Sequence, residues 1–329
     1  MKIVIPDDYQ DIVHRLACFS LIGGHEVTRY RAPAASFEEL AARLGEAEVV
    51  VSIRERVEFS RTLIERLPRL RLIALVGRGS GRIDYAACTE HGVMVATGRS
   101  NSPEAPAELT IAMILASRRN VALEAEWMKR GEWPSTLSHR LRGSTLGVFG
   151  LGAIGALVAR AGRGLGMEVL VWGREGSLAR ARAAGYAVAD HQSSLFERAD
   201  VVSLHVRLSA ATRGIVGSAD LARMKPTALI VNTARAELIA PGALVAALRA
   251  GRPGYAAVDV YEEEPVRGDH PLLAMPNALC LPHLGWAEWE NFELYFREAF
   301  EQIAAYAAGG ALRLANPEVK PRARADSDM

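Results

Sequence analysis

The chain has 329 residues, which is long enough for two domains and a large hydrophobic core. Half of its residues are hydrophobic, 23% are charged, and the formal net charge is +1. This near-neutral balance gives no support for binding to nucleic acid or to a membrane surface. No run approaches the roughly 18 consecutive apolar residues of a membrane-spanning helix, so the sequence predicts none.

The N-terminal segment MKIVIPDDYQ has no basic start and no long apolar stretch, so we expect no signal peptide. Cys18, Cys88 and Cys280 are isolated, odd in number and without CxxC spacing. Such cysteines are typical of buried free thiols in a reducing compartment, and we expect a cytoplasmic protein. The sequence shows no cluster with metal-ligand spacing, so we expect no metal site.

Strand-like and helix-like runs alternate from the N-terminus onward, which is typical of a parallel α/β protein. In the first part of the chain we expect strands over residues 2–6, 25–30, 49–53 and 72–76, and helices over 11–19, 37–44 and 62–67. From Ser102 the pattern changes, because Pro103 and Pro106 precede a long helix over 107–119 with an apolar stripe. We interpret this helix as a connector between two domains.

A glycine-rich turn follows the strand expected over residues 145–149. Gly150, Gly152 and Gly155 have GxGxxG spacing, a helical apolar face follows, and a second strand is expected over 169–172. The first glycine permits a tight turn, the second lets the backbone approach a pyrophosphate, and the third lets the helix pack close to the strand. The pyrophosphate would then lie at a helix N-terminus, so we expect a dinucleotide site.

The residue that ends the second strand of such a unit usually is Asp or Glu and binds the ribose 2′-hydroxyl of the adenosine. Here this position is Gly173, and Arg174 follows. The missing carboxylate removes repulsion of a 2′-phosphate, the guanidinium is a natural phosphate partner, and Ser177 could add a hydroxyl. We therefore expect NADP in preference to NAD. In the alternative, Arg174 only stacks on the adenine or faces solvent.

The alternation continues with strands over residues 201–205, 229–232, 256–260 and 278–281 and a long helix over 287–307. The polar end of the chain, 321–329, is expected to be disordered. Since the helix over 287–307 is long enough to return to the first domain, we expect discontinuous domains. Residues 1–98 with 284–329 would form a substrate domain, and residues 99–283 would form the dinucleotide-binding domain.

Charged side chains follow several expected strands, at the edge of a parallel sheet where ligands bind. Arg54 follows the strand over 49–53, Arg235 the one over 229–232, Glu264 the one over 256–260, and His283 the one over 278–281. A histidine can transfer a proton near neutral pH, and a carboxylate beside it orients the ring. An arginine can bind a carboxylate with two hydrogen bonds and polarise an adjacent carbonyl.

The chain resembles the D-isomer-specific 2-hydroxyacid dehydrogenase family over nearly its whole length. The motifs that carry this resemblance, in order, are GRGSGRID at 77–84, LGVFGLGAIG at 146–155, MKPTALIVNTARAELI at 224–239, AAVDVYEEEP at 256–265, PHLG at 282–285 and NPEV at 316–319. The resemblance implies two Rossmann-like or flavodoxin-like parallel-sheet domains, an active site in the cleft between them, and a homodimer joined through the cofactor domains. It also implies an enzyme that transfers a hydride between NAD(P)H and a small 2-keto or D-2-hydroxy acid, as a glyoxylate or hydroxypyruvate reductase does.

Site residues are carried over by position in these motifs. Arg235 matches the arginine that binds the substrate carboxylate and carbonyl oxygen, Glu264 the partner of the catalytic histidine, and His283 the acid/base itself. Arg54 matches a substrate contact, backbone N–H groups around Gly79 would hold the carboxylate, and Arg78 binds either an anion or a structural ion-pair partner. The positions implied for the cofactor domain's site are Gly150, Gly152, Ala153, Ile154, Gly155, Gly173, Arg174, Ser177, His205 (with a structural role), Thr212, Thr233, Ala234 and Asp259, which lies near the nicotinamide end.

Three positions depart from the family pattern. Ala236 replaces the common glycine after the motif arginine, and Arg207 replaces a common proline and adds a charge near the cofactor. Trp286 stands where a small residue is common; it either walls the substrate pocket or packs where the two domains meet. These departures put the substrate in doubt more than the chemistry.

Other functions stay open at this point. A cofactor-sensing binding protein, like the dehydrogenase-related transcriptional corepressors, would use the same fold, although the Arg, Glu and His set favours an enzyme. Formate dehydrogenation is disfavoured, because formate oxidation needs no proton relay and those relatives have Gln at the position of Glu264. Phosphite oxidation remains a further option.

Overall fold

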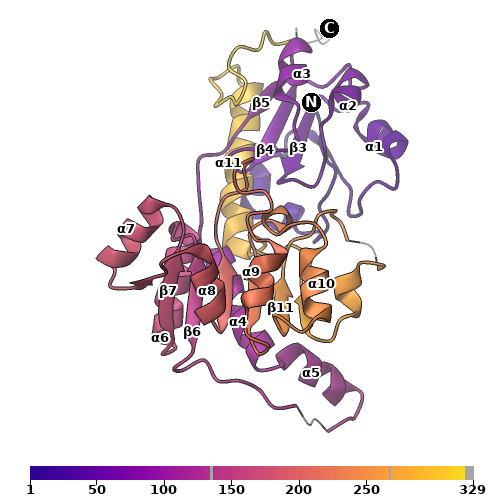
Figure 1. The fold of residues 1–329 in the computed structure, drawn as a ribbon. Helices are drawn as coiled ribbons and strands as arrows, with labels where there is room; N and C mark the ends of the chain where they lie inside the picture. The colour runs from indigo at the N-terminus through magenta and orange to yellow at the C-terminus, as the bar shows by residue number, and fades with distance from the viewer. Residues whose placement is uncertain (134–135, 267, 323–329) are drawn as a thin grey trace, which may run out of the picture. The chain divides into compact units, whose positions relative to one another are not determined.

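The computed structural model describes residues 1–133, 136–266 and 268–322. The chain divides into two compact units, whose helices and strands are labelled in Figure 1. Unit 1 combines Met1–Ser102 with the chain from Glu288 onward, and unit 2 is Pro103–Ala287. The chain therefore leaves unit 1 after Ser102 and returns to it at Glu288, a few residues later at each crossing than the boundaries expected from the sequence.

Unit 1 contains a five-stranded sheet in the order β2-β1-β3-β4-β5, and every pair of neighbouring strands is parallel. The strands are β1 (Lys2–Ile5), β2 (Glu26–Arg29), β3 (Val49–Ile53), β4 (Leu72–Val76) and β5 (Met94–Ala96). The helices are α1 (Phe37–Leu44), α2 (Arg61–Glu65), α3 (Tyr85–Glu90) and α11 (Trp289–Ala307). All residues of β3 and β4 are buried, as expected for central strands covered on both faces.

The helix expected over residues 11–19 does not form. Two 3₁₀ helices, η1 (Val13–Arg15) and η2 (Ala17–Ile22), take its place. The carboxylate of Asp8 accepts hydrogen bonds from the N–H groups of Ile12 and Val13, which caps the start of η1. Leu16 has extended backbone angles (φ −70°, ψ 141°) and separates the two helices. The capping by Asp8 and the extended Leu16 therefore prevent the single helix that the apolar spacing predicted.

Helix α11 carries the chain back into unit 1. Figure 1 shows it in yellow along the strands of this unit, and it packs against β4 and η2. Phe292, Phe296, Phe300 and Ile303 are buried and recur at spacings of three and four residues. This apolar stripe explains why a helix forms here and which of its faces meets the sheet.

Unit 2 contains a seven-stranded parallel sheet in the order β12-β11-β10-β9-β6-β7-β8. The strands are β6 (Thr145–Phe149), β7 (Glu168–Trp172), β8 (Ala187–Val188), β9 (Val201–Leu204), β10 (Leu229–Asn232), β11 (Tyr255–Val258) and β12 (Ala278–Cys280). The helices are α4 (Glu104–Arg118), α5 (Val121–Lys129), α6 (Ala153–Gly164), α7 (Glu175–Ala183), α8 (Gln192–Arg198), α9 (Ser218–Arg223), α10 (Ala243–Arg249), and the 3₁₀ helices η3 (Ala236–Leu238) and η4 (Pro271–Ala274). Two parallel-sheet α/β units confirm the predicted fold class.

Helix α4 is more than the connector that the sequence suggested. It packs against α6, β10 and β11, all in unit 2. Its Met113 and Ile114 lie in one buried cluster with Leu146, Val148 and Val158. The apolar stripe of α4 therefore forms part of the core of unit 2, because it covers one face of the sheet.

Two other expectations concern the cysteines and the end of the chain. Cys18 and Cys88 are buried free thiols, as expected, whereas Cys280 is half-buried. Disorder was expected over residues 321–329. Residues 323–329 of this segment lie outside the described residues. Within the described parts of the chain, the structure contains no helix with the length and apolar character needed to cross a membrane.

Candidate functional site

His283 and Glu264 lie in direct contact in unit 2. His283 follows β12, and its Nδ1 atom lies 2.6 Å from Oε2 of Glu264. The other carboxylate oxygen of Glu264 accepts the N–H of Tyr261 at 2.9 Å. Burial by itself raises the pKa of Glu264. The bond to His283, the charge of His283, the Tyr261 N–H and the charge of Arg235 together outweigh burial, so the pKa lies below its ordinary value. Glu264 is therefore an ionised carboxylate near neutral pH and orients the imidazole.

The backbone at His283 is held in an unusual conformation. Its φ is +54°, in the left-handed region that side chains other than glycine seldom adopt. The buried carboxylate of Asp259 accepts the next two N–H groups, from Leu284 at 2.7 Å and from Gly285 at 2.8 Å. Burial raises the pKa of Asp259, and these two N–H groups and the charge of His283 partly offset the rise. Asp259 thus fixes the loop that presents His283, and its implied contact with a cofactor stays a prediction.

A buried asparagine shapes the turn that carries Arg235. Nδ2 of Asn232, the last residue of β10, donates to the carbonyl of Arg235 at 2.9 Å, and its Oδ1 accepts the N–H of Ala234 at 3.0 Å. Nη1 of Arg235 donates to the carbonyl of Ala234 at 2.6 Å. The hydroxyl of Thr233 lies 2.7 Å from that of Thr110 in α4. The sequence did not predict this role of Asn232, although a polar residue at the end of an apolar strand can indicate one.

The three glycines after β6 have three different surroundings. Gly150 has φ +97°, which requires glycine, and a methyl group on Gly155 would lie 2.2 Å from the carbonyl oxygen of Gly150. A methyl group on Gly152 would meet no heavy atom within 4 Å. Gly152 also precedes α6, with Ala153 and Ile154 in the first turn of this helix. One glycine thus forms the turn, one permits close helix packing, and one leaves open space at a helix N-terminus, which fits a pyrophosphate.

The end of β7 lies beside this loop. A methyl group on Gly173 would lie 3.5 Å from Cα of Gly150, and Arg174 after it is exposed. The buried hydroxyl of Ser177 accepts the N–H of Leu151 at 3.2 Å, so it holds α7 against the glycine-rich loop. Nε of Arg180 donates to the carbonyl of Leu151 at 2.7 Å, a contact that the sequence did not suggest. Ser177 therefore has a bond within the protein in addition to the phosphate contact expected of it.

His205 and Thr212 belong to the segment after β9. His205 is partly buried, its Nε2 lies 2.8 Å from the hydroxyl of Ser203, and burial lowers its pKa to about 4. The ring is therefore neutral near pH 7. Oγ1 of Thr212 donates to the carbonyl of Arg207 at 2.7 Å and accepts the N–H of Ser209 at 2.8 Å. Both side chains stabilise the segment that runs beside the glycine-rich loop.

The predicted substrate residues of unit 1 gather at the ends of β3 and β4. Arg54 has φ +54°, and a methyl group on Gly77 would lie 3.2 Å from Nη1 of Arg54. Arg78 is exposed, and its Nη2 donates to Oδ1 of Asn101 at 3.2 Å, so this arginine bonds to an amide rather than to a carboxylate. Gly79 belongs to the same loop. Arg54 thus lies with the loop that was expected to bind a carboxylate.

Arg56 and Trp286 differ from simple surface residues. The guanidinium of Arg56 donates to the carbonyl of Asp7 and lies 4.4 Å from the ring centre of Tyr9, so Arg56 packs against the segment that follows β1. Trp286, in unit 2, is buried. A role of Trp286 in substrate binding stays a prediction.

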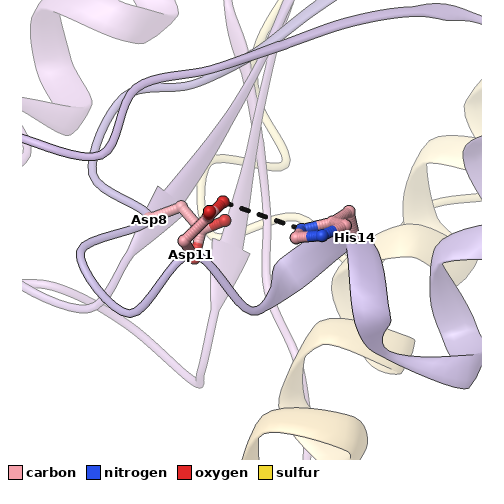
Figure 2. Close-up of side chains that lie close together, drawn as sticks. All are labelled: Asp8, Asp11 and His14. Atoms are coloured by element: carbon pink, nitrogen blue, oxygen red, sulfur yellow. Dashed lines mark ion pairs between the residues drawn. The ribbon is translucent and has the colours of Figure 1, made fainter.

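Three potential metal ligands lie close together in unit 1: Asp8, Asp11 and His14 (Figure 2). Figure 2 marks the ion pair between Asp11 and His14, whose atoms lie 3.7 Å apart. Nη1 of Arg29 lies 2.6 Å from Oδ2 of Asp8 and 2.7 Å from Oδ1 of Asp11. The guanidinium supplies the positive charge that a cation would bring, so we assign this group a structural role.

Comparison with known proteins places these features in context. A family model described as "D-isomer specific 2-hydroxyacid dehydrogenase, NAD binding domain" matches residues 111–285. A D-3-phosphoglycerate dehydrogenase of Methanocaldococcus jannaschii is 38% identical over 250 residues, which are 75% of this chain but only 47% of that protein. A glyoxylate reductase of Aeropyrum pernix is 34% identical over 293 residues, 85% of each chain. The solved structure of an oxidoreductase from Ralstonia solanacearum has 47% identity and a TM-score of 0.93, covering 96% of this chain and 97% of that one.

Proposed function

Because this chain belongs to the D-isomer-specific 2-hydroxyacid dehydrogenase family, as its motifs predicted, we propose that it is an NAD(P)-dependent oxidoreductase acting on the CH–OH group of a D-2-hydroxy acid and on the matching 2-keto acid. The observation that carries this proposal is the contact between His283 and Glu264, with the charge of Arg235 acting on the same carboxylate. A positioned acid/base beside an anion-binding guanidinium is what such a reaction requires of a protein. The relatives named glyoxylate reductase and D-3-phosphoglycerate dehydrogenase suggest a small substrate.

His283 is the proposed proton donor and acceptor. Its Nδ1 is engaged by Glu264, which leaves Nε2 to give a proton to the carbonyl oxygen of the keto acid or to take one from the hydroxyl of the hydroxy acid. The ionised Glu264 stabilises the charged imidazolium that exists before the proton is given up. Tyr261 and Asp259 keep the carboxylate and the histidine loop in place.

Arg235 is the proposed anchor of the substrate. Its guanidinium would bind the carboxylate and polarise the adjacent carbonyl, and Asn232 sets the conformation of the turn that presents it. We propose Arg54, Arg78 and the loop around Gly79 as further substrate contacts. Trp286 is proposed to limit the size of the substrate side chain.

The glycine-rich loop and its neighbours would hold the cofactor. Gly150, Gly152 and Gly155, with Ala153 and Ile154 at the start of α6, fit the pyrophosphate. When bound, the nicotinamide supplies or accepts the hydride. We propose Gly173, Arg174 and Ser177 for the adenosine end, with NADP preferred over NAD because no carboxylate ends β7. Segments around His205, Thr212, Thr233, Ala234 and Asp259 would complete the site.

We also propose a homodimer formed through unit 2. Helix α5 has no buried residue, and the segment after it exposes Trp133 to 87% and Leu137 to 92%. Figure 1 shows α5 extending away from the sheet of unit 2. A second copy of the same surface would bury these side chains, as expected for an exposed apolar patch of this kind.

The test of the enzyme proposal compares three variants. His283→Ala and Arg235→Ala should lower the turnover of a 2-keto acid by about 100-fold or more, while the dissociation constant of the reduced cofactor changes little. The matched control is Arg223→Ala, because Arg223 lies on α9 and pairs with Glu197. Turnover that persists in either test variant would contradict the assignment. A wild-type protein that binds cofactor but turns over no keto acid would favour the cofactor-sensing alternative.

A further inference from the structure

The segment that carries Arg207 lies next to the glycine-rich loop, on the side opposite the segment that carries Arg174. A methyl group on Gly150 would lie 2.8 Å from Cγ1 of Val206 and 2.9 Å from the carbonyl oxygen of His205. On the other side, a methyl group on Gly173 would lie 3.5 Å from Cα of Gly150. The sheet explains this arrangement, because β6 lies between β9 and β7 and all three strands are parallel. The residues that follow β9 and β7 therefore meet at the turn that follows β6.

The segment that carries Arg207 has a defined shape. The buried Thr212 donates from its hydroxyl to the carbonyl of Arg207 and accepts the N–H of Ser209, and its own N–H donates to the carbonyl of Ser209 at 3.0 Å. Val206 lies against Gly150 from within the same segment. These contacts fix the backbone of Arg207 while its side chain stays exposed. The position of the Arg207 backbone relative to the loop is therefore set by the fold.

Arg174 and Arg207 follow the two strands, β7 and β9, that flank β6. Arg174 and Arg207 are both exposed, and among residues 1–133, 136–266 and 268–322 neither forms an ion pair. The nearest carboxylate in sequence to Arg174, Glu175, pairs instead with Arg182 at 2.9 Å. Arg180 adds a third guanidinium, bonded to the carbonyl of Leu151. Two uncompensated cations on fixed backbones favour an anionic group between them.

We propose that Arg207 is a second determinant of NADP specificity, which binds the 2′-phosphate together with Arg174. This inference rests on the proposed cofactor preference and goes beyond it, because Arg174 lies at the position where the fold ordinarily reads the ribose, whereas Arg207 follows a different strand. A phosphate dianion can accept charge-assisted hydrogen bonds from two guanidinium groups at once. The competing role for Arg207 is contact with the pyrophosphate, which NAD and NADP share.

Equilibrium binding separates these roles, because NADPH and NADH differ only in the 2′-phosphate. The dissociation constants of both are measured by fluorescence titration for the wild type, Arg207→Ala, Arg174→Ala, the double variant and the control Arg223→Ala. We expect Arg207→Ala to weaken NADPH binding by about 10-fold and NADH binding by less than about 2-fold, since one charged contact is lost from one ligand only. Arg207→Lys, which keeps the charge, should lose less. Calorimetric titration with 2′,5′-ADP should show the same loss without the nicotinamide.

Each other outcome is decisive. Equal weakening of NADPH and NADH would place Arg207 at the pyrophosphate and overturn the proposal, and so would a loss no larger than that of Arg223→Ala. A wild-type protein that binds NADH more tightly would overturn both the proposed NADP preference and the role of Arg207. That result would leave the enzyme assignment standing, because turnover of a 2-keto acid with NADH tests it separately.

Discussion

Oε2 of Glu264 lies 2.6 Å from Nδ1 of His283, while Oε1 of the same carboxylate accepts the N–H of Tyr261. The backbone bond fixes the carboxylate, and the fixed carboxylate sets the orientation of the imidazole. The histidine and its partner are thus separated by 19 residues in sequence but form one unit.

Glu264→Gln tests this relationship. Gln keeps the shape of the side chain but removes the negative charge, so the imidazolium loses its stabilisation and turnover should fall by about 10- to 100-fold. The matched control is Glu262→Gln in the same acidic run, where Glu262 lies 3.7 Å from His270. Steady-state rates of both variants are the measurement, and an equal fall in the two would argue against a special role for Glu264.

The two glycines at positions 152 and 155 should respond differently to the same substitution. Gly152→Ala meets open space, so the free energy of unfolding should change by less than about 1 kcal/mol, whereas cofactor binding should weaken because a methyl group occupies the approach of the pyrophosphate. Gly155→Ala forces its methyl group against the carbonyl of Gly150 and should destabilise the protein by about 1–3 kcal/mol.

Urea unfolding and cofactor titration of both variants provide the comparison. Undiminished cofactor affinity in Gly152→Ala would mean that the loop does not hold the pyrophosphate. A fully stable Gly155→Ala would mean that the packing of α6 against the loop is looser than the structure indicates.

His205 should make stability depend on pH. Its pKa is lowered from 6.5 to about 4 by burial, so the unfolded chain takes up a proton between these pH values while the folded protein does not. The contribution to stability is therefore complete above pH 6.5 and is lost as the pH falls toward about 4, in total about 3 kcal/mol. In urea unfolding across this range, the free energy of unfolding of the wild type should fall toward acid pH by about 3 kcal/mol more than that of His205→Gln. Parallel curves would show that the ring titrates normally in the folded state.

From the exposed apolar residues after α5 we predict a homodimer. Trp133→Glu combined with Leu137→Glu should convert a dimer into a monomer, because two charges would have to be buried in the contact. The control is Leu273→Glu in η4, which changes another exposed leucine of unit 2. Sedimentation velocity gives the answer, and a monomeric wild type or a dimeric double variant would remove this surface from consideration.

The parallel α/β architecture was predictable because apolar runs such as Val49–Ile53 and Leu72–Val76 form strands with the expected bounds. The break between η1 and η2, in place of one helix over residues 11–19, was not predictable. The capping by Asp8 and the extended Leu16 depend on local hydrogen bonds that apolar spacing does not reveal. Helix α5 was not predicted either, because it has no buried residue and hence no clear stripe.

At the candidate site, the sequence proposed the groups whose residue type can carry the chemistry, and their catalytic roles stay predictions. His283, Glu264 and Arg235 stood out as charged residues at strand ends within long motifs. The residues that orient them did not, because the bonds of Asn232 to the Arg235 turn and of Asp259 to the His283 loop link backbone groups whose positions only the fold defines. The sequence placed Arg207 near the cofactor, but the contact of the two preceding residues, His205 and Val206, with Gly150 became visible only in the structure.

The most direct measurement is the initial rate of the wild-type protein with glyoxylate, hydroxypyruvate, pyruvate and a bulkier 2-keto acid, each with NADPH and with NADH. We expect oxidation of the reduced cofactor with at least one small keto acid, faster with NADPH than with NADH. Turnover with NADH preferred would keep the chemistry of His283, Glu264 and Arg235 but contradict the cofactor preference. Tight cofactor binding with no turnover of any keto acid would contradict the proposal that this protein is an oxidoreductase acting on 2-keto acids.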